Sequence, residues 1–244
     1  MTVQTYPDPV KLSEAAALLF KRKATEAVKK RGRFTVALSG GSSPQRLSEL
    51  LASDRFRSEI PWKDVIIFWG DERFVPPDDP QSNARMAREC LLDHVPVPSD
   101  QIHPIPTGGS PETAAKQYGD SLASVWNQSP LPRFDFVLLG LGENGHTASL
   151  FPETEVLNEQ KKWVAPVFLE EQQQYRITLT APLLNNARCV MFLVFGHSKA
   201  QVLHNVLEGP SQPSKLPAQL IDPAAGKLYW LLDEAAASGL VHHN

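Results

Sequence analysis

One short stretch constrains this chain more than any other: residues 140–152, which read Gly-Leu-Gly-Glu-Asn-Gly-His-Thr-Ala-Ser-Leu-Phe-Pro. It directly follows the apolar run 134–139, which predicts a buried strand. The glycine-rich turn then places His146 just past the carboxyl end of that strand, where open α/β sheets bind ligands. An unperturbed imidazole has a pKa of about 6.5, which suits proton transfer near neutral pH. His146 is therefore the first candidate catalytic residue.

Gly140, Gly142 and Gly145 also spell G-x-G-x-x-G, the dinucleotide-binding fingerprint. That fingerprint requires a long helix after the third glycine, because the helix N-terminus holds the pyrophosphate. Pro152 follows Gly145 after only seven residues, which is too soon for an ordinary helix of about 11 residues. We therefore predict that no dinucleotide binds here, and we expect no cofactor.

The length and charge of the chain limit its class. The 244 residues allow one large α/β domain or two small ones. Because no proline-rich stretch resembles an interdomain linker, we expect a single domain over residues 1–244. The net charge of −3 argues against binding to nucleic acid or to an anionic membrane.

Localisation and metal binding are also constrained by the sequence. The first twenty residues lack the layout of a signal peptide, and the apolar run at 189–195 is far too short to span a membrane. Cys90 and Cys189 lie in apolar contexts, as expected for buried thiols in a reducing compartment. No spacing of His, Cys, Asp and Glu resembles a metal site. We expect a cytoplasmic monomer without a metal.

Strand and helix signals alternate along the chain, and several strands are continuous apolar runs. That pattern is typical of a parallel sheet with helices on both faces. The residues before the first strand are expected to form one helix that ends at Gly32. Strands are expected at 34–38, 65–69, 134–139, 176–180, 189–195 and 227–232, and helices at 10–31, after Pro44, at 82–92, at 110–126 and at the C-terminus.

Four loops after these strands carry polar or glycine-rich sequence: 39–44, 70–73, 140–146 and 196–199. The loops that follow parallel strands emerge at one edge of a doubly wound sheet. We therefore expect the four loops to converge on a single site.

The loop after the first predicted strand contains Gly40, Gly41, Ser42 and Ser43. We expect Ser42 or Ser43 to cap the helix that follows, leaving backbone N–H groups at a positive helix end that suits a phosphate. The loop lacks the lysine of a Walker A motif, so a triphosphate is not implied. An ordinary capped turn is the alternative interpretation.

Asp71, Glu72 and Arg73 follow the very apolar strand 65–69. Arg73 is suited to clamp a phosphate with two hydrogen bonds. The alternative is an ion pair of Arg73 with Asp71 or Glu72. Asp71 is itself a candidate catalytic carboxylate or an orienting group for the arginine.

Lys199 lies in the sequence Ser198-Lys-Ala-Gln201, which has the form of a capping box. This places Lys199 in the first turn of the next helix, where its charge opposes the helix dipole. A bound anion would relieve that conflict, whereas a solvated lysine is the alternative.

Taken together, these segments resemble the 6-phosphogluconolactonases, lactone hydrolases of the oxidative pentose phosphate pathway in the glucosamine-6-phosphate isomerase/6-phosphogluconolactonase family. The resemblance implies a three-layer α/β/α fold with a mostly parallel, doubly wound, Rossmann-like sheet, shared with glucosamine-6-phosphate deaminases. The specific piece is His-Thr-Ala-Ser-Leu-Phe-Pro at 146–152. The other matching pieces are 39–44, 69–73, the earlier part of 140–152, 176–185 and 196–200.

The resemblance also implies roles for individual residues. His146 becomes the general base, while Arg73 and Lys199 hold the substrate phosphate together with the loop 39–43. Arg176, expected at a strand start, also reaches that phosphate. The implied reaction is hydrolysis of a small sugar-phosphate lactone, 6-phospho-D-glucono-1,5-lactone, to 6-phospho-D-gluconate.

One position departs from the family pattern. The family usually has Asp-Gly-His where this chain has Asn144-Gly-His146. An amide can hydrogen-bond to the imidazole but cannot stabilise its charged form as a carboxylate would, so Asn144 is assigned only an orienting role.

Two other functions are compatible with parts of the sequence. A deaminase/isomerase of amino-sugar phosphates on the same fold would need extra carboxylates near the histidine, and Asn144 argues against it. The other is the sugar-phosphate-sensing domain of a regulator, which would need a DNA-binding element such as a helix-turn-helix. Only about thirty residues precede the first predicted strand, and they are expected to form one helix, which leaves no room for that element. The G-x-S-x-G elbow of serine hydrolases is absent, so we expect water, not a serine, to attack the lactone.

Overall fold

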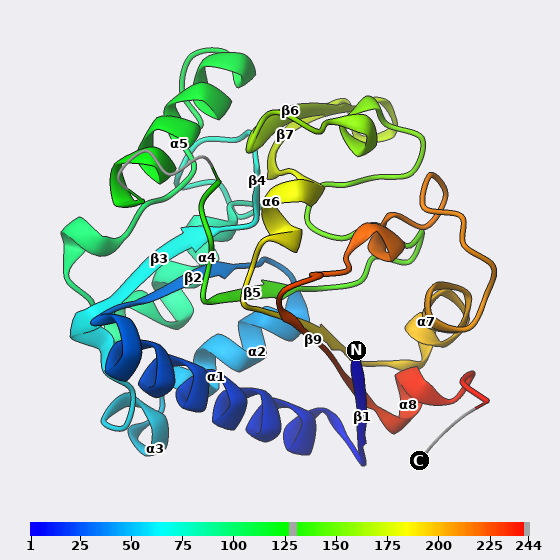
Figure 1. Ribbon diagram of the computed structural model, residues 1–244, viewed down its shortest axis with the longest axis horizontal. Helices are drawn as coiled ribbons and strands as arrows, with labels where there is room; N and C mark the ends of the chain where they lie inside the picture. The colour runs from blue at the N-terminus through cyan, green and yellow to red at the C-terminus, as the bar shows by residue number, and fades with distance from the viewer. Residues whose placement is uncertain (127–130, 242–244) are drawn as a thin grey trace.

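The computed structural model describes residues 1–126 and 131–241. Its centre is a six-stranded, fully parallel sheet (Figure 1). The strands, in spatial order, are β1 (Thr2–Tyr6), β9 (Lys227–Asp233), β8 (Cys189–Val194), β5 (Phe136–Leu139), β2 (Phe34–Leu38) and β3 (Val65–Trp69). The predicted mostly parallel α/β architecture is confirmed.

Helices cover both faces of this sheet. Helices α1 and α2 lie on one face, and α5 and α6 lie on the other together with a second, three-stranded sheet (Figure 1). Phe20 of α1 packs on Phe34 and Phe136 of the sheet, with ring centroids 5.3 and 5.6 Å apart. The helices are α1 (Pro9–Arg31), α2 (Ser42–Ala52), α3 (Asp54–Arg57), α4 (Asn83–Cys90), α5 (Pro111–Val125), α6 (Ala181–Asn185), α7 (Ala200–Leu207) and α8 (Glu234–Ala237).

The ends of several helices follow the sequence signals. The Asp8 carboxylate accepts hydrogen bonds from two N–H groups in the first turn of α1, and Gly32 ends that helix with φ of 71°. Ser82 and Ser110 cap α4 and α5 as predicted. Local side-chain chemistry is enough to set these boundaries.

The second sheet was not predicted. It is antiparallel, in the order β4 (Asp71–Arg73), β7 (Gln174–Leu179) and β6 (Val164–Leu169). The expected strand at 176–180 therefore belongs to this sheet and not to the parallel one. Residues 71–73, expected in a loop, form a strand because β7 supplies a backbone partner.

Strand β1 was also missed, so the expectation that a single helix precedes the first strand is wrong. Its sequence, Thr-Val-Gln-Thr-Tyr, is mostly exposed and carries little apolar signal. Pairing with β9, in the register Thr2 to Tyr229, makes it the edge strand.

Tyr118 of α5 fastens the end of β3. Its fully buried hydroxyl accepts a hydrogen bond from the Trp69 N–H at 2.7 Å and donates one to the Trp69 carbonyl at 2.9 Å. Gly70 and β4 follow directly, so this contact positions the chain that enters the small sheet.

We expect Tyr118→Phe to lower the free energy of unfolding by about 1–3 kcal/mol, because two buried backbone groups of Trp69 lose their partner. Urea unfolding measures the change. Tyr175→Phe is the matched control, since Tyr175 is 40% exposed. Equal stability of the two variants would contradict the prediction.

Candidate active site

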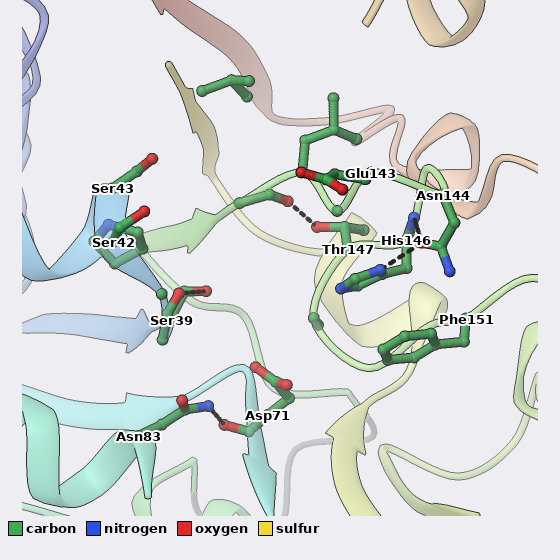
Figure 2. Close-up of a pocket in the computed structure, with 18 of the residues that line it drawn as sticks. Ser39, Ser42, Ser43, Asp71, Asn83, Glu143, Asn144, His146, Thr147 and Phe151 are labelled. Carbon is green, nitrogen blue, oxygen red and sulfur yellow. Dashed lines mark hydrogen bonds between the residues drawn. The ribbon is translucent and has the colours of Figure 1, made fainter. Parts of the chain in front are cut away.

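A cavity of about 530 Å³ opens at the carboxyl edge of the parallel sheet (Figure 2). Its walls come from the loops after β2, β5 and β8, from β4, and from the hairpin that joins β6 to β7. The structure brings every candidate site residue to this cavity: Gly40, Gly41, Ser42, Ser43, Asp71, Arg73, Asn144, His146, Arg176 and Lys199.

Helix α2 begins at this cavity without a side-chain cap. The N-cap residue is Gly41, whose φ of 99° favours glycine. The prediction that Ser42 or Ser43 caps the helix is therefore wrong: both lie inside its first turn. Their backbone N–H groups have no partner within the helix, and Figure 2 shows both side chains across the pocket from His146.

Gly40 is required by close packing against a residue that the sequence analysis missed. A Cβ atom at position 40 would lie 1.8 Å from the amide oxygen of Asn83. The amide nitrogen of Asn83 donates to the backbone carbonyl of Asp71 at 2.9 Å (Figure 2). Asn83 thus ties the loop after β2 to strand β4.

Arg73 lies directly opposite Arg176 in the pairing of β4 with β7. The guanidinium of Arg73 donates to the Gln81 carbonyl at 2.6 Å, and that of Arg176 donates to the Gln172 side-chain oxygen at 2.5 Å. Both Nε atoms are buried without a hydrogen-bond partner among the described residues. Burial and the charge of Arg73 lower the pKa of Arg176.

Like charges directly across a strand pair are destabilising. The two arginines therefore form a site of concentrated positive charge with unused donors. Arg176 is the third residue of β7 and not at its start as expected.

The two acidic neighbours of Arg73 make other contacts. The buried Glu72 carboxylate accepts hydrogen bonds from the Ser82 hydroxyl and from the N–H groups of Asn83 and Ala84 at the start of α4. Burial raises the pKa of Glu72. The alternative in which Arg73 pairs with Asp71 or Glu72 is not seen among the described ion pairs.

Asp71 forms part of the cavity wall in a fixed orientation. It is 6% exposed, and one of its carboxylate oxygens accepts a hydrogen bond from the Ser149 hydroxyl at 2.7 Å. The Ser149 N–H donates to the Thr178 hydroxyl on β7 at 3.2 Å. This chain of bonds links the loop after β5 to both neighbouring strands of the small sheet.

The orientation of the His146 ring is set by Asn144. The Asn144 side-chain oxygen lies 3.2 Å from the His146 backbone N–H and 2.6 Å from its Nδ1. Because a backbone N–H can only donate, that amide atom is the acceptor, and Nδ1 must carry a proton. The lone pair of the neutral ring is therefore on Nε2.

Two further residues shape the position of the ring. Phe151 stacks on it, with centroids 4.0 Å apart and an angle of 15° between the planes (Figure 2). A Cβ atom at Gly142 would lie 2.0 Å from the imidazole, so only glycine fits there. The phenylalanine was not identified from the sequence as a contact of the ring.

The surroundings of His146 disfavour its charged form. Burial is the largest cause, and the charges of Arg176, Lys199 and Arg73 add to it, lowering its pKa to about 4. The ring is therefore neutral near pH 7.

Lys199 ends a short 3₁₀ turn (His197–Lys199) that immediately precedes α7. The prediction that it lies in the first turn of the helix is wrong, and the expected capping box of Ser198 does not form. Lys199 Nζ lies 3.7 Å from a carboxylate oxygen of Glu143. Glu143 was not among the predicted site residues.

The loop that contains the G-x-G-x-x-G sequence does not continue into a long helix. After Gly145, residues 146–154 form turns and an isolated β-bridge between Thr147 and Leu150, followed by a 3₁₀ helix at Glu155–Asn158. Over residues 1–126 and 131–241, no group of three or more His, Cys, Asp or Glu side chains is arranged to hold a metal ion. Over the same residues, no helix has the length and apolar character needed to cross a membrane.

Comparison with known proteins decides the family. Residues 7–230 match the family described as glucosamine-6-phosphate isomerases/6-phosphogluconolactonase. The chain belongs to this family. A 6-phosphogluconolactonase of Synechocystis sp. is 43% identical over 232 residues, which cover 94% of each chain.

Solved structures of the family share the fold. The 6-phosphogluconolactonase from Trypanosoma brucei superposes with a TM-score of 0.86 at 30% identity, and 98% of each chain is covered. A monomeric glucosamine-6-phosphate deaminase superposes with a TM-score of 0.82 at 20% identity, covering 98% of this chain and all of the other. The latter similarity shows that the deaminase has the same fold, as the sequence resemblance implied.

We expect the pKa of His146 to rise from about 4 when inorganic phosphate binds, because the anion offsets the three cationic charges that lower it. Asn144→Asp should also raise it, since a carboxylate stabilises the imidazolium. The pKa is the midpoint of an NMR titration of the imidazole signal. That signal is assigned to His146 by its absence from the spectrum of His146→Ala. A midpoint unaffected by saturating phosphate would contradict the prediction.

Proposed function

We propose that this chain hydrolyses 6-phospho-D-glucono-1,5-lactone to 6-phospho-D-gluconate. The observation that carries the proposal is a neutral imidazole with a free Nε2 in a cavity that also contains three cationic side chains. The relatives named 6-phosphogluconolactonase, from Synechocystis sp. and Trypanosoma brucei, support it.

The phosphate binds between the small sheet and the start of α2. Arg73 and Arg176 supply the planar donors that match phosphate oxygens, and Lys199 adds a point charge. The first-turn N–H groups of Ser42 and Ser43 lie at the positive end of the helix, where anions are stabilised. Binding an anion here removes the repulsion between the two arginines.

The anchored phosphate holds C1 of the lactone near His146. Nε2 takes a proton from water as the water oxygen attacks C1, forming a tetrahedral oxyanion. The bond from C1 to the ring oxygen then breaks, and that oxygen takes the proton from the imidazolium. A positioned base of this kind contributes about 10²–10⁴-fold, and fixing the phosphate adds the advantage of proximity.

Asn144 and Asp71 have supporting roles in this mechanism. Asn144 keeps the proton on Nδ1 and so keeps Nε2 available as the base. Asp71, fixed by Ser149, lies next to the arginines and orients them toward the phosphate.

We propose the hydrolase and not the deaminase/isomerase, because residue 144 is an amide where that chemistry calls for further carboxylates near the histidine. The structural similarity to a deaminase, at 20% identity, concerns the fold alone. We further propose that residues 1–244 act as one domain in a cytoplasmic monomer. The single-domain part is supported by the cavity, whose lining residues are spread along the chain from Ser39 to Lys199.

His146→Ala should lower kcat by about 10²–10⁴-fold with little change in KM, because it removes the base without touching the phosphate anchors. The lactone is generated in situ, and acid release is followed above the spontaneous background. His94→Ala, a histidine outside the cavity, is the control. Equal rates for wild type and His146→Ala would refute the assigned base.

Arg73→Ala or Arg176→Ala should raise KM for the phosphorylated lactone about 10- to 100-fold, because a charge-assisted hydrogen bond is worth about 1.5–3 kcal/mol. The rate with unphosphorylated glucono-1,5-lactone should not fall, because that substrate has no phosphate for the arginines to bind. An equal loss of activity with both lactones would mean that the arginines do not bind the phosphate.

A further inference from the structure

The three cations of the cavity differ in the charge of their protein partners. Arg73 and Arg176 each donate to a neutral oxygen, as described above. Lys199, by contrast, lies 3.7 Å from the carboxylate of Glu143. Neither arginine has an ion pair among the described residues, although the charges of Asp71 and Glu72 act on Arg176 from nearby. Lys199 directly contacts a protein anion.

The contact between Lys199 and Glu143 is easily broken. At 3.7 Å it is an ion pair longer than a hydrogen bond. The Lys199 side chain is only 23% exposed, but that of Glu143 is 71% exposed. Glu143 belongs to the same loop as Asn144 and His146 (Figure 2) and can swing into water without disturbing the core.

We propose that Glu143 weakens the binding of phosphorylated ligands by competing with their phosphate for Lys199. A phosphate that reaches Lys199 must displace the carboxylate or share the lysine with it. The identity of substrate and product here rests on the proposed function: hydrolysis turns a neutral ester into a carboxylate, so the product is the more anionic ligand. Without Glu143, Lys199 would have no ion-pair partner among the described residues and would hold that product more tightly.

Two other carboxylates line the cavity and must be distinguished from Glu143. Asp71 is fixed by Ser149 and lies on the strand of Arg73. Glu171 comes from the hairpin between β6 and β7 and is exposed; among the described ion pairs, it is not a partner of Lys199. Glu171→Gln therefore removes the same charge from the same cavity without affecting the lysine directly.

The test measures dissociation constants of inorganic phosphate and of 6-phosphogluconate by titration calorimetry. Glu143→Gln should bind both ligands about twofold to fivefold more tightly, the range set by exposed ion pairs. The dissociation constants of Glu143→Asp should stay close to those of wild type. The gain in affinity of Glu171→Gln should be less than half of that of Glu143→Gln. In a Lys199→Met background, Glu143→Gln should have no effect.

Three results would overturn the inference: unchanged binding in Glu143→Gln, an equal gain in Glu171→Gln, or a gain that persists in the Lys199→Met background. If the chain hydrolyses the lactone, KM and the product inhibition constant should fall together in Glu143→Gln. Failure to hydrolyse the lactone would refute the proposed function and leave the calorimetric result standing, so the two failures are distinguishable.

Discussion

The pairing of β4 with β7 is the constraint on which the cavity depends. It sets Arg73 opposite Arg176, a repulsive arrangement that the nearby charges of Asp71 and Glu72 offset in part. A site of this kind stores unfavourable electrostatic energy that an anion can release. The same two strands hold Asp71 through Ser149 and Thr178, so the charged wall is rigid before any ligand arrives.

In the proposed mechanism, phosphate binding and catalysis are coupled through His146. The cations suited to a phosphate are also those that, with burial, lower the pKa of the imidazole. With no anion among these cations, the ring is a weak base. A substrate phosphate bound there would raise the pKa of the ring, and so would link recognition of one end of the proposed substrate to chemistry at the other.

Particular residues show how far sequence reasoning reaches. The turn that carries His146, the Ser82 cap of α4 and the end of α1 at Gly32 are local features, and each was predicted. The small sheet was not, because Asp71–Arg73 has no strand pattern and forms one only by pairing with residues about a hundred positions later. Glu143, Asn83 and Phe151 were missed as site residues for a similar reason: their roles depend on what lies beside them in space.

The sequence by itself determined the parallel α/β sheet, the edge at which the cavity opens and the histidine at that edge, because apolar runs and glycine turns act through neighbouring residues. Only the tertiary structure decided which nitrogen of His146 is free, how the three cations are partnered and why α2 begins without a cap. These properties depend on geometry that residue patterns do not specify. The Lys199–Glu143 contact joins distant segments, whereas the Asn144–His146 and Arg176–Gln172 contacts are short in sequence but are set by the exact conformation of a turn.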